Sequence, residues 1–135
     1  MHARFTIVSV ALVLLVGCSS LASPRCQPSE QAMVNDLLYF GMAKPGGVVS
    51  AEEWAAFLGS VVTPRFPAGL TSWPASGQWR SADGSLTRES SHILNLMHAS
   101  DAASEAAVRE VVAEYKAQFK QEAVLRVKSY ACVSF

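Results

Sequence analysis

Five polar side chains are of the types that form ligand-binding or acid–base sites. They are two amides, two guanidinium groups and one carboxylate: Gln78, Arg80, Glu89, Gln121 and Arg126. Arg80 and Glu89 flank a predicted turn and can lie nearly opposite on paired strands, where opposite charges contribute about 0.2–1 kcal/mol. A cross-strand ion pair is therefore one interpretation. The other is a polar pocket around Arg80, Glu89 and Arg126 beside an open sheet face, with Tyr39 and Trp79 in its lining.

The histidine and serine spacing carries no metal or nucleophile signature. His92 and His98 are six residues apart, about 20 Å along a strand, so they cannot hold one metal ion together. Each is either a lone acid–base group or a histidine near a strand end. The sequence has no Gly-x-Ser-x-Gly motif. Gly46-Gly47 precedes a helix whose first turn carries Glu52 and Glu53, which disfavours a bound phosphate there. We therefore predict no metal and no cofactor, and favour a non-catalytic protein.

The beginning of the chain is typical of an exported protein. A weakly basic start precedes an apolar run from Phe5 to Val16, which is too short for a membrane-spanning helix and matches a secretory signal peptide. The run ends in Leu15-Val16-Gly17-Cys18, which resembles the lipobox of bacterial lipoproteins. The resemblance implies a diacylglyceryl group on the Cys18 sulfur and cleavage just before it. The alternative is an ordinary signal peptide followed by a chance cysteine.

The lipobox divides the chain into a signal peptide (1–17), a tether (18–32) and one domain (33–135). Stable anchoring requires two or more acyl chains, which a diacylglyceryl cysteine with palmitate-type chains supplies. The expected partner is thus a membrane, contacted through lipid on the periplasmic side of the envelope. By resemblance to lipoproteins of Gram-negative bacteria, Ser19 rather than Asp after the lipidated cysteine favours the outer membrane in such a host.

The lipobox also changes the cysteine count. If Cys18 carries lipid, Cys26 and Cys132 remain as an even pair in an oxidising compartment, and we predict a disulfide between them. It would close a loop of about 106 residues, worth about 4–5 kcal/mol in the chain-entropy model. Two buried free thiols are the alternative. A metal site is disfavoured because neither residue has a Cys-x-x-Cys or Cys-x-x-His neighbour.

Hydrophobic periodicity predicts six elements in the domain. They are a strand over 33–43, a helix over 50–62, an edge or bulged strand over 70–80, a strand over 86–98, a helix from 100 or 101 to 120, and a strand over 122–135. The clearest boundary is the capping box Ser50-Ala51-Glu52-Glu53, with Val49 and Trp54 spaced as a hydrophobic staple. Trp54 is expected in the core, whereas Trp73 and Trp79 are either core residues or exposed aromatic contacts.

This order of elements predicts an α+β protein with the ferredoxin-like βαββαβ plait. Its four-stranded sheet is antiparallel, with the first and third strands in the centre and both helices on one face. The apolar residues of the last strand, Leu125 and Val127 among them, are expected to face the helices. Cys132 would then lie on the open face, and the tether would run near that face.

Composition limits the class of partner. The 135 residues contain eleven Lys+Arg and eleven Asp+Glu, spread along the chain rather than grouped. A chain of this length forms one domain with its own core. No basic patch of the kind that binds nucleic acid is visible, so we predict no nucleic-acid partner.

Five segments resemble a family of small exported bacterial proteins known only as domain of unknown function 3574. They are Leu38–Gly41, Thr63–Thr71, Gly77–Arg80, Gln121–Arg126 and Cys132–Phe135. The resemblance covers about residues 34 to 135. It implies a free-standing exported domain and provides no catalytic residue to transfer.

Two functions follow from these observations. The first is an envelope lipoprotein whose non-catalytic domain binds an envelope protein, or a second copy as a homodimer, through the open sheet face. The second is a small enzyme or ligand-binding module with the pocket around Arg80, Glu89 and Arg126. A flat apolar sheet face would favour the first, and a deep pocket with converging polar groups would favour the second.

Overall fold

The computed structural model describes residues 25–80 and 83–135, without the side chain of Trp79. The predicted signal peptide and Cys18 lie outside this range. The elements in chain order are β1 (Gln31–Gly41), β2 (Ala43–Lys44), β3 (Gly47–Val48), α1 (Ala51–Phe57), the π-helical turn η1 (Leu58–Val62), β4 (Thr71–Arg80), β5 (Leu86–His98), α2 (Ala102–Phe119) and β6 (Leu125–Val133). In the described part of the chain, no helix has the length and apolar character needed to cross a membrane.

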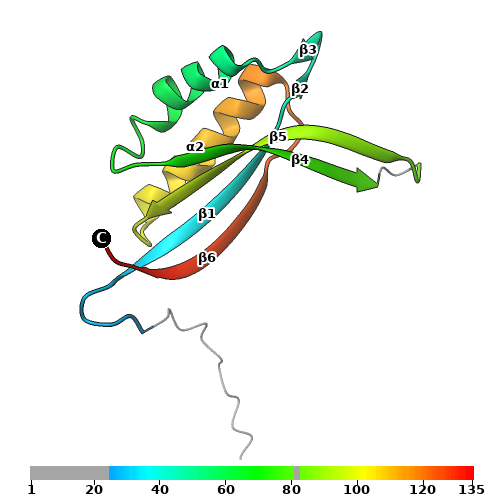
Figure 1. Cartoon of the computed structure of the whole chain (residues 1–135). Helices are drawn as coiled ribbons and strands as arrows, with labels where there is room; N and C mark the ends of the chain where they lie inside the picture. The colour runs from blue at the N-terminus through cyan, green and yellow to red at the C-terminus, as the bar shows by residue number, and fades with distance from the viewer. Residues whose placement is uncertain (1–24, 81–82) are drawn as a thin grey trace, which may run out of the picture.

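The sheet confirms the predicted plait. Its strand order is β4-β5-β1-β6, and all three pairings are antiparallel. Both helices lie on the same face of the sheet (Figure 1). This is the ferredoxin-like arrangement, with the first and third long strands in the centre. The strand that contains Pro74 is at an edge, as its missing backbone N–H requires.

The core lies between the helices and the even-numbered residues of the central strands. Along β1 the even positions from Val34 to Phe40 are fully buried, and the odd positions are half-buried. An aromatic cluster fills the centre, with Phe40 4.5 Å from the Tyr115 ring and 5.3 Å from the Trp54 ring. Trp54 is thus a core residue, as predicted.

Helix α1 begins where the sequence predicts. The Ser50 side chain accepts a hydrogen bond from the Glu53 backbone N–H, and the Glu53 carboxylate accepts one from the Ser50 N–H, which completes the capping box. The helix then widens into η1, where the Thr63 N–H donates to the Leu58 carbonyl. Helix α2 begins at Asp101, whose side chain caps Ser104, and ends at Lys120 with a left-handed backbone (φ 57°).

The predicted orientation of β6 is wrong. Residues Arg126 and Lys128 face the helices, because both contact Glu105 on α2. The odd-numbered Leu125 and Val127 are instead 61% and 45% exposed on the open face. The pattern misled because apolar side chains were assigned to the core, whereas this part of the core holds the buried carboxylate of Asp36, which needs a cationic partner.

The register of β6 also corrects the expected position of Cys132. The pairing with β1 is regular and matches Cys132 with Ala32, so Cys132 shares the parity of Arg126 and faces the helix side. As the sequence predicts, the sulfur atoms of Cys26 and Cys132 lie at disulfide-bonding distance, 2.08 Å apart. Cys26 is therefore joined to the domain where β1 begins and β6 ends, on the helix side of the sheet.

Candidate functional site

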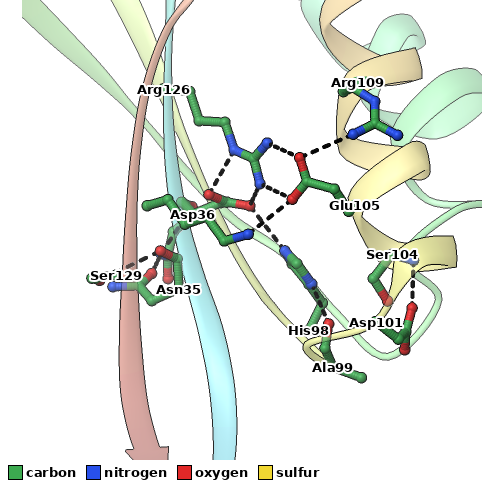
Figure 2. A network of polar contacts seen from close by, with 12 residues as sticks. Asn35, Asp36, His98, Ala99, Asp101, Ser104, Glu105, Arg109, Arg126 and Ser129 are labelled. Atoms are coloured by element: carbon green, nitrogen blue, oxygen red, sulfur yellow. Dashed lines mark hydrogen bonds and ion pairs between the residues drawn. The ribbon is translucent and has the colours of Figure 1, made fainter. Parts of the chain in front are cut away.

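A network of charged side chains joins β1, β5, β6 and α2 (Figure 2). At its centre, Asp36 has no solvent exposure. Arg126 donates to both oxygens of Asp36, over 2.8 and 2.6 Å, and to both oxygens of Glu105, over 2.7 and 2.8 Å. Lys128 donates to Glu105 over 3.0 Å, and Arg109 approaches the same carboxylate over 3.3 Å.

His98 completes this network from the end of β5. Its Nε2 lies 2.9 Å from Asp36 Oδ2, and its Nδ1 lies 2.8 Å from the Ala99 carbonyl oxygen. The carbonyl only accepts hydrogen bonds, and so does a carboxylate held by a guanidinium. The His98 imidazole thus lies between two acceptors, and Asp36 is contacted by both Arg126 and His98 in a buried position.

The same contacts shift the acidity of the two carboxylates. Burial opposes ionisation of Asp36, but hydrogen bonds from Arg126 and His98 outweigh it and lower the pKa of Asp36. Hydrogen bonds from Arg126, and then from Lys128, lower the pKa of Glu105 to about 2. Both groups raise the pKa of Arg126, the Glu105 hydrogen bond most. All three therefore remain charged near neutral pH.

This network is suited to holding the fold, not to catalysis. A histidine paired with an aspartate acts as a general base only if its second nitrogen has a free lone pair. Both nitrogens of His98 face acceptors, and the imidazole is only 6% exposed. His92, the other candidate, packs 4.8 Å from the Trp54 ring with Nδ1 near the Met42 sulfur, and burial lowers its pKa.

The open face of the sheet, opposite the helices, presents two aligned rows of side chains. The strand register places one residue of each of the four long strands in each row. The rows are Trp73, Ile93, Tyr39 and Leu125, and Thr71, Asn95, Leu37 and Val127. We call these eight residues the central band. None carries a charge, and Trp73, Leu125 and Val127 are 39%, 61% and 45% exposed.

Two polar side chains of this face are bonded to each other. The Asn95 side-chain nitrogen donates to the Asn35 side-chain oxygen. Trp73 is an exposed aromatic residue of this face, not a core residue, which decides between the two environments that the sequence allowed for it. The side chain of Trp79 lies outside the described part of the structure.

A hollow of about 670 Å³ adjoins the central band where β1 ends. Its walls come from the end of β1, the β2–β3 turn, the β4–β5 hairpin and the loop between α2 and β6. The lining residues are Tyr39, Gly41, Ala43, Lys44, Pro45, Gly77, Gln78, Glu89, Ser91, Lys120, Gln121, Glu122, Ala123 and Leu125. This volume lies in the range of small-molecule sites.

Two oxygen acceptors converge on the floor of the hollow at Gly41. A Cβ atom at this position would overlap Glu89 Oε1 and lie 3.1 Å from Gln121 Oε1. The Gln121 side-chain nitrogen donates to the Ala43 carbonyl, which fixes the amide orientation and turns its oxygen inward. A side chain at position 41 would therefore displace the flexible end of Glu89 from this floor, and Gly41 is not held at an unusual backbone angle.

The hollow unites four of the seven site residues that the sequence singled out. Tyr39, Gln78, Glu89 and Gln121 line it together. Arg126 lies on the opposite face with Asp36, and Arg80 donates to the Gly84 carbonyl near the hairpin turn. The structure thus does not bring together the predicted pocket around Arg80, Glu89 and Arg126.

The expected Arg80–Glu89 ion pair is also absent from the described contacts. Arg80 pairs with Leu86 and Glu89 with Gly77, so the two are offset by three residues along the hairpin. Glu89 has no hydrogen bond or ion pair to any described residue.

Sequence reasoning missed Asp36, Glu105 and Gly41. Asp36 carried a usable signal, because a single carboxylate inside the apolar run of β1 must be buried and therefore paired. The roles of Gly41 and Glu105 depend on contacts with distant chain segments, and no local sequence pattern predicts those contacts.

Comparison with known proteins supports this fold. The family described as "Protein of unknown function (DUF3574)" matches residues 35–135. No curated protein matches the chain. Among solved structures, a phage SAM lyase in complex with S-methyl-5′-thioadenosine is similar at a TM-score of 0.55 and 12% identity, covering 84% of this chain and 96% of that one. CutA from Synechococcus elongatus, complexed with a Bis-Tris molecule, is similar at a TM-score of 0.52 and 15% identity, covering 78% and 87%. At such identities the likeness concerns the fold alone.

Proposed function

The chain belongs to the DUF3574 family, whose function is unknown, and we propose that it is a lipid-anchored envelope protein whose domain forms a homodimer through the open sheet face. The observation that carries the dimer is the central band, an uncharged surface across four strands with large side chains exposed to solvent. Monomeric soluble proteins rarely expose contiguous apolar surface of this kind without a partner.

Several features favour a second copy as the occupant. The central band has no charged residue, and its Asn95 donates a hydrogen bond to the adjacent Asn35. Two such faces can therefore meet without buried unpaired charge, and a two-fold dimer requires a surface that complements itself. Removal of residues 1–17 takes away Arg4 and leaves ten basic against eleven acidic residues, so long-range repulsion between copies is small.

Export and lipid anchoring rest on the sequence and on the cysteine pair. The lipobox-like stretch ending at Cys18 supports lipidation, and the bonding distance between Cys26 and Cys132 fits an oxidising compartment. A Cys18→Ala variant is expected to lose the acyl-modified N-terminal peptide in mass spectrometry and to leave the membrane fraction. An unmodified Cys18 in the parent protein would contradict the lipid anchor.

The dimer is tested by sedimentation equilibrium of the full chain in density-matched detergent. Val127→Lys places a charge in the central band and is expected to yield a monomer. Val48→Lys is the matched control, because Val48 is also an exposed strand valine, 64% accessible, but lies on β3 away from the open face. A monomeric parent protein, or equal effects of the two substitutions, would refute the proposed interface.

A further inference from the structure

The hollow at the end of β1 has a chemistry that the proposed dimer does not explain. Its lining is mostly apolar, with the Tyr39 ring, Leu125 and Ala123 on one side and Ala43 and Pro45 on another. All of these residues come from one chain, and Tyr39 and Leu125 also belong to the central band, so the hollow shares two residues with the proposed dimer interface. Hollows of this volume, apolar with a few converging polar groups, commonly bind small molecules.

Both polar groups of the floor accept hydrogen bonds, and one of them, Glu89, carries a negative charge. Glu89 Oε1 and Gln121 Oε1 both approach the space above Gly41. The Gln121 side-chain nitrogen, which could otherwise offer a hydrogen-bond donor in the hollow, donates to the Ala43 carbonyl. The nearby phenol of Tyr115 donates to the Gly41 carbonyl over 2.8 Å, so its hydrogen is not available either.

The cations around the hollow do not neutralise Glu89. The ammonium of Lys44 donates to both carboxylate oxygens of Glu53 and lies over the face of the Phe119 ring. Lys120 is an exposed residue at the end of α2, and the rim also carries the carboxylate of Glu122. Within the described chain, the Glu89 carboxylate therefore faces the hollow without an ionic partner.

The sequence segments point to the same place. Three of the five segments that carry the family resemblance meet here, with Tyr39 and Gly41 from the first, Gly77 and Gln78 from the third, and four residues of 121–126 from the fourth. These lining residues are far apart in the chain, and none of them belongs to the buried core. Gly41 also keeps the floor free of a side chain that would displace the carboxylate.

We propose that this hollow binds a small organic ammonium ion with an apolar body. The ammonium would donate to Glu89 and Gln121 at the floor, and the apolar body would lie against Tyr39 and Leu125. A charge-assisted hydrogen bond to a partly desolvated carboxylate supplies the specificity for a cation, and the aromatic ring of Tyr39 packs against the apolar body.

The test uses the full-length protein in nonionic detergent with 2-phenylethylammonium as the probe. Isothermal titration calorimetry gives the affinity, and ¹⁵N NMR locates the shifted backbone amides. We expect saturable binding in the micromolar to millimolar range, with shifts centred on Gly41, Glu89 and Gln121. The uncharged analogue 2-phenylethanol is expected to bind at least about tenfold more weakly, since it lacks the charge-assisted bond.

The decisive variant is Glu89→Gln, which keeps the shape and removes the charge, and it should weaken ammonium binding about tenfold or more. The matched control is Glu114→Gln, an exposed carboxylate on α2 far from the hollow, which should leave binding unchanged. Unfolding midpoints of both variants show that each is folded. Absence of saturable binding, equal affinity for 2-phenylethanol, or unchanged binding in Glu89→Gln would each overturn the proposal.

Discussion

Replacement of Arg126 by Met tests whether the charged network holds β6 against the rest of the fold. The substitution keeps most of the aliphatic stem and removes the guanidinium that donates to both Asp36 and Glu105. It leaves Asp36, which has no solvent exposure, with the His98 imidazole as its remaining side-chain partner. Loss of one partner from a buried ion pair costs about 3–5 kcal/mol.

The lower part of that range applies here, because the Arg126 side chain is 21% exposed and His98 remains. We therefore expect a loss of about 3 kcal/mol, which is a large share of the roughly 5–15 kcal/mol of a typical domain. The matched control is Arg109→Met. Arg109 also contacts Glu105, but its side chain is 65% exposed, so its pair is worth at most about 0.5 kcal/mol.

The assay is urea unfolding followed by far-UV circular dichroism, with the cysteine pair kept oxidised. Both variants lose one positive charge, so the difference between them isolates the buried contacts. If Arg126→Met and Arg109→Met agree within about 1 kcal/mol, the reasoning that a buried carboxylate depends on Arg126 is refuted.

Three further outcomes follow from the same structure. The pKa of Glu105 is about 2 in the folded protein, against an ordinary value near 4.5. Its stabilising contribution is therefore complete above about pH 4.5 and is lost as the pH falls toward 2. Glu105→Gln should flatten the dependence of the unfolding free energy on pH in that window, and an unchanged slope would contradict this role of Glu105. Replacing both Cys26 and Cys132 by Ser should lower the free energy of unfolding by about 2–5 kcal/mol in thermal unfolding. Two free thiols in the denatured parent protein would contradict the disulfide. Ser50→Ala removes the side-chain acceptor for the Glu53 N–H and should cost about 0.5–2 kcal/mol in urea unfolding, whereas Ser60→Ala in the same helical segment, whose hydroxyl donates to the Ala56 carbonyl, should cost less.

Much of the fold was predictable because local chemistry marks its boundaries. The capping box at Ser50 and the turn at Asp83-Gly84 each correspond to a boundary in the structure, and Pro74 lies on an edge strand as it predicts. The alternation of strands and helices then leaves few arrangements, and the ferredoxin-like plait is the simplest of them. These features depend on neighbouring residues, so one sequence suffices to read them.

The orientation of β6 was not predictable in the same way. Its apolar and polar residues alternate, and the usual rule places the apolar set inward. The rule fails because Asp36 lies inside and is bonded by Arg126, and Lys128 on the same side of β6 bonds to Glu105 of α2, while Leu125 and Val127 turn to the open face. The pattern of β6 alone therefore cannot show which of its two faces is turned toward the helices.

The candidate site shows a similar division. The residue types Tyr39, Gln78, Glu89 and Gln121 were recognisable as polar groups that could act together, and they do line one hollow. Arg80 and Arg126 could not be separated from them, because their positions depend on the hairpin register and on the buried charge of Asp36. Strand register and the partners of buried charges are set by tertiary packing.

The most direct measurement is photo-crosslinking in the native envelope from a photoreactive amino acid at position 127, with the same group at position 48 as the control. The account predicts that position 127 yields an adduct of two copies of this chain, identified by mass spectrometry, and that position 48 does not. An adduct between position 127 and a different protein, or no adduct from that position, would contradict a homodimer formed through the open sheet face.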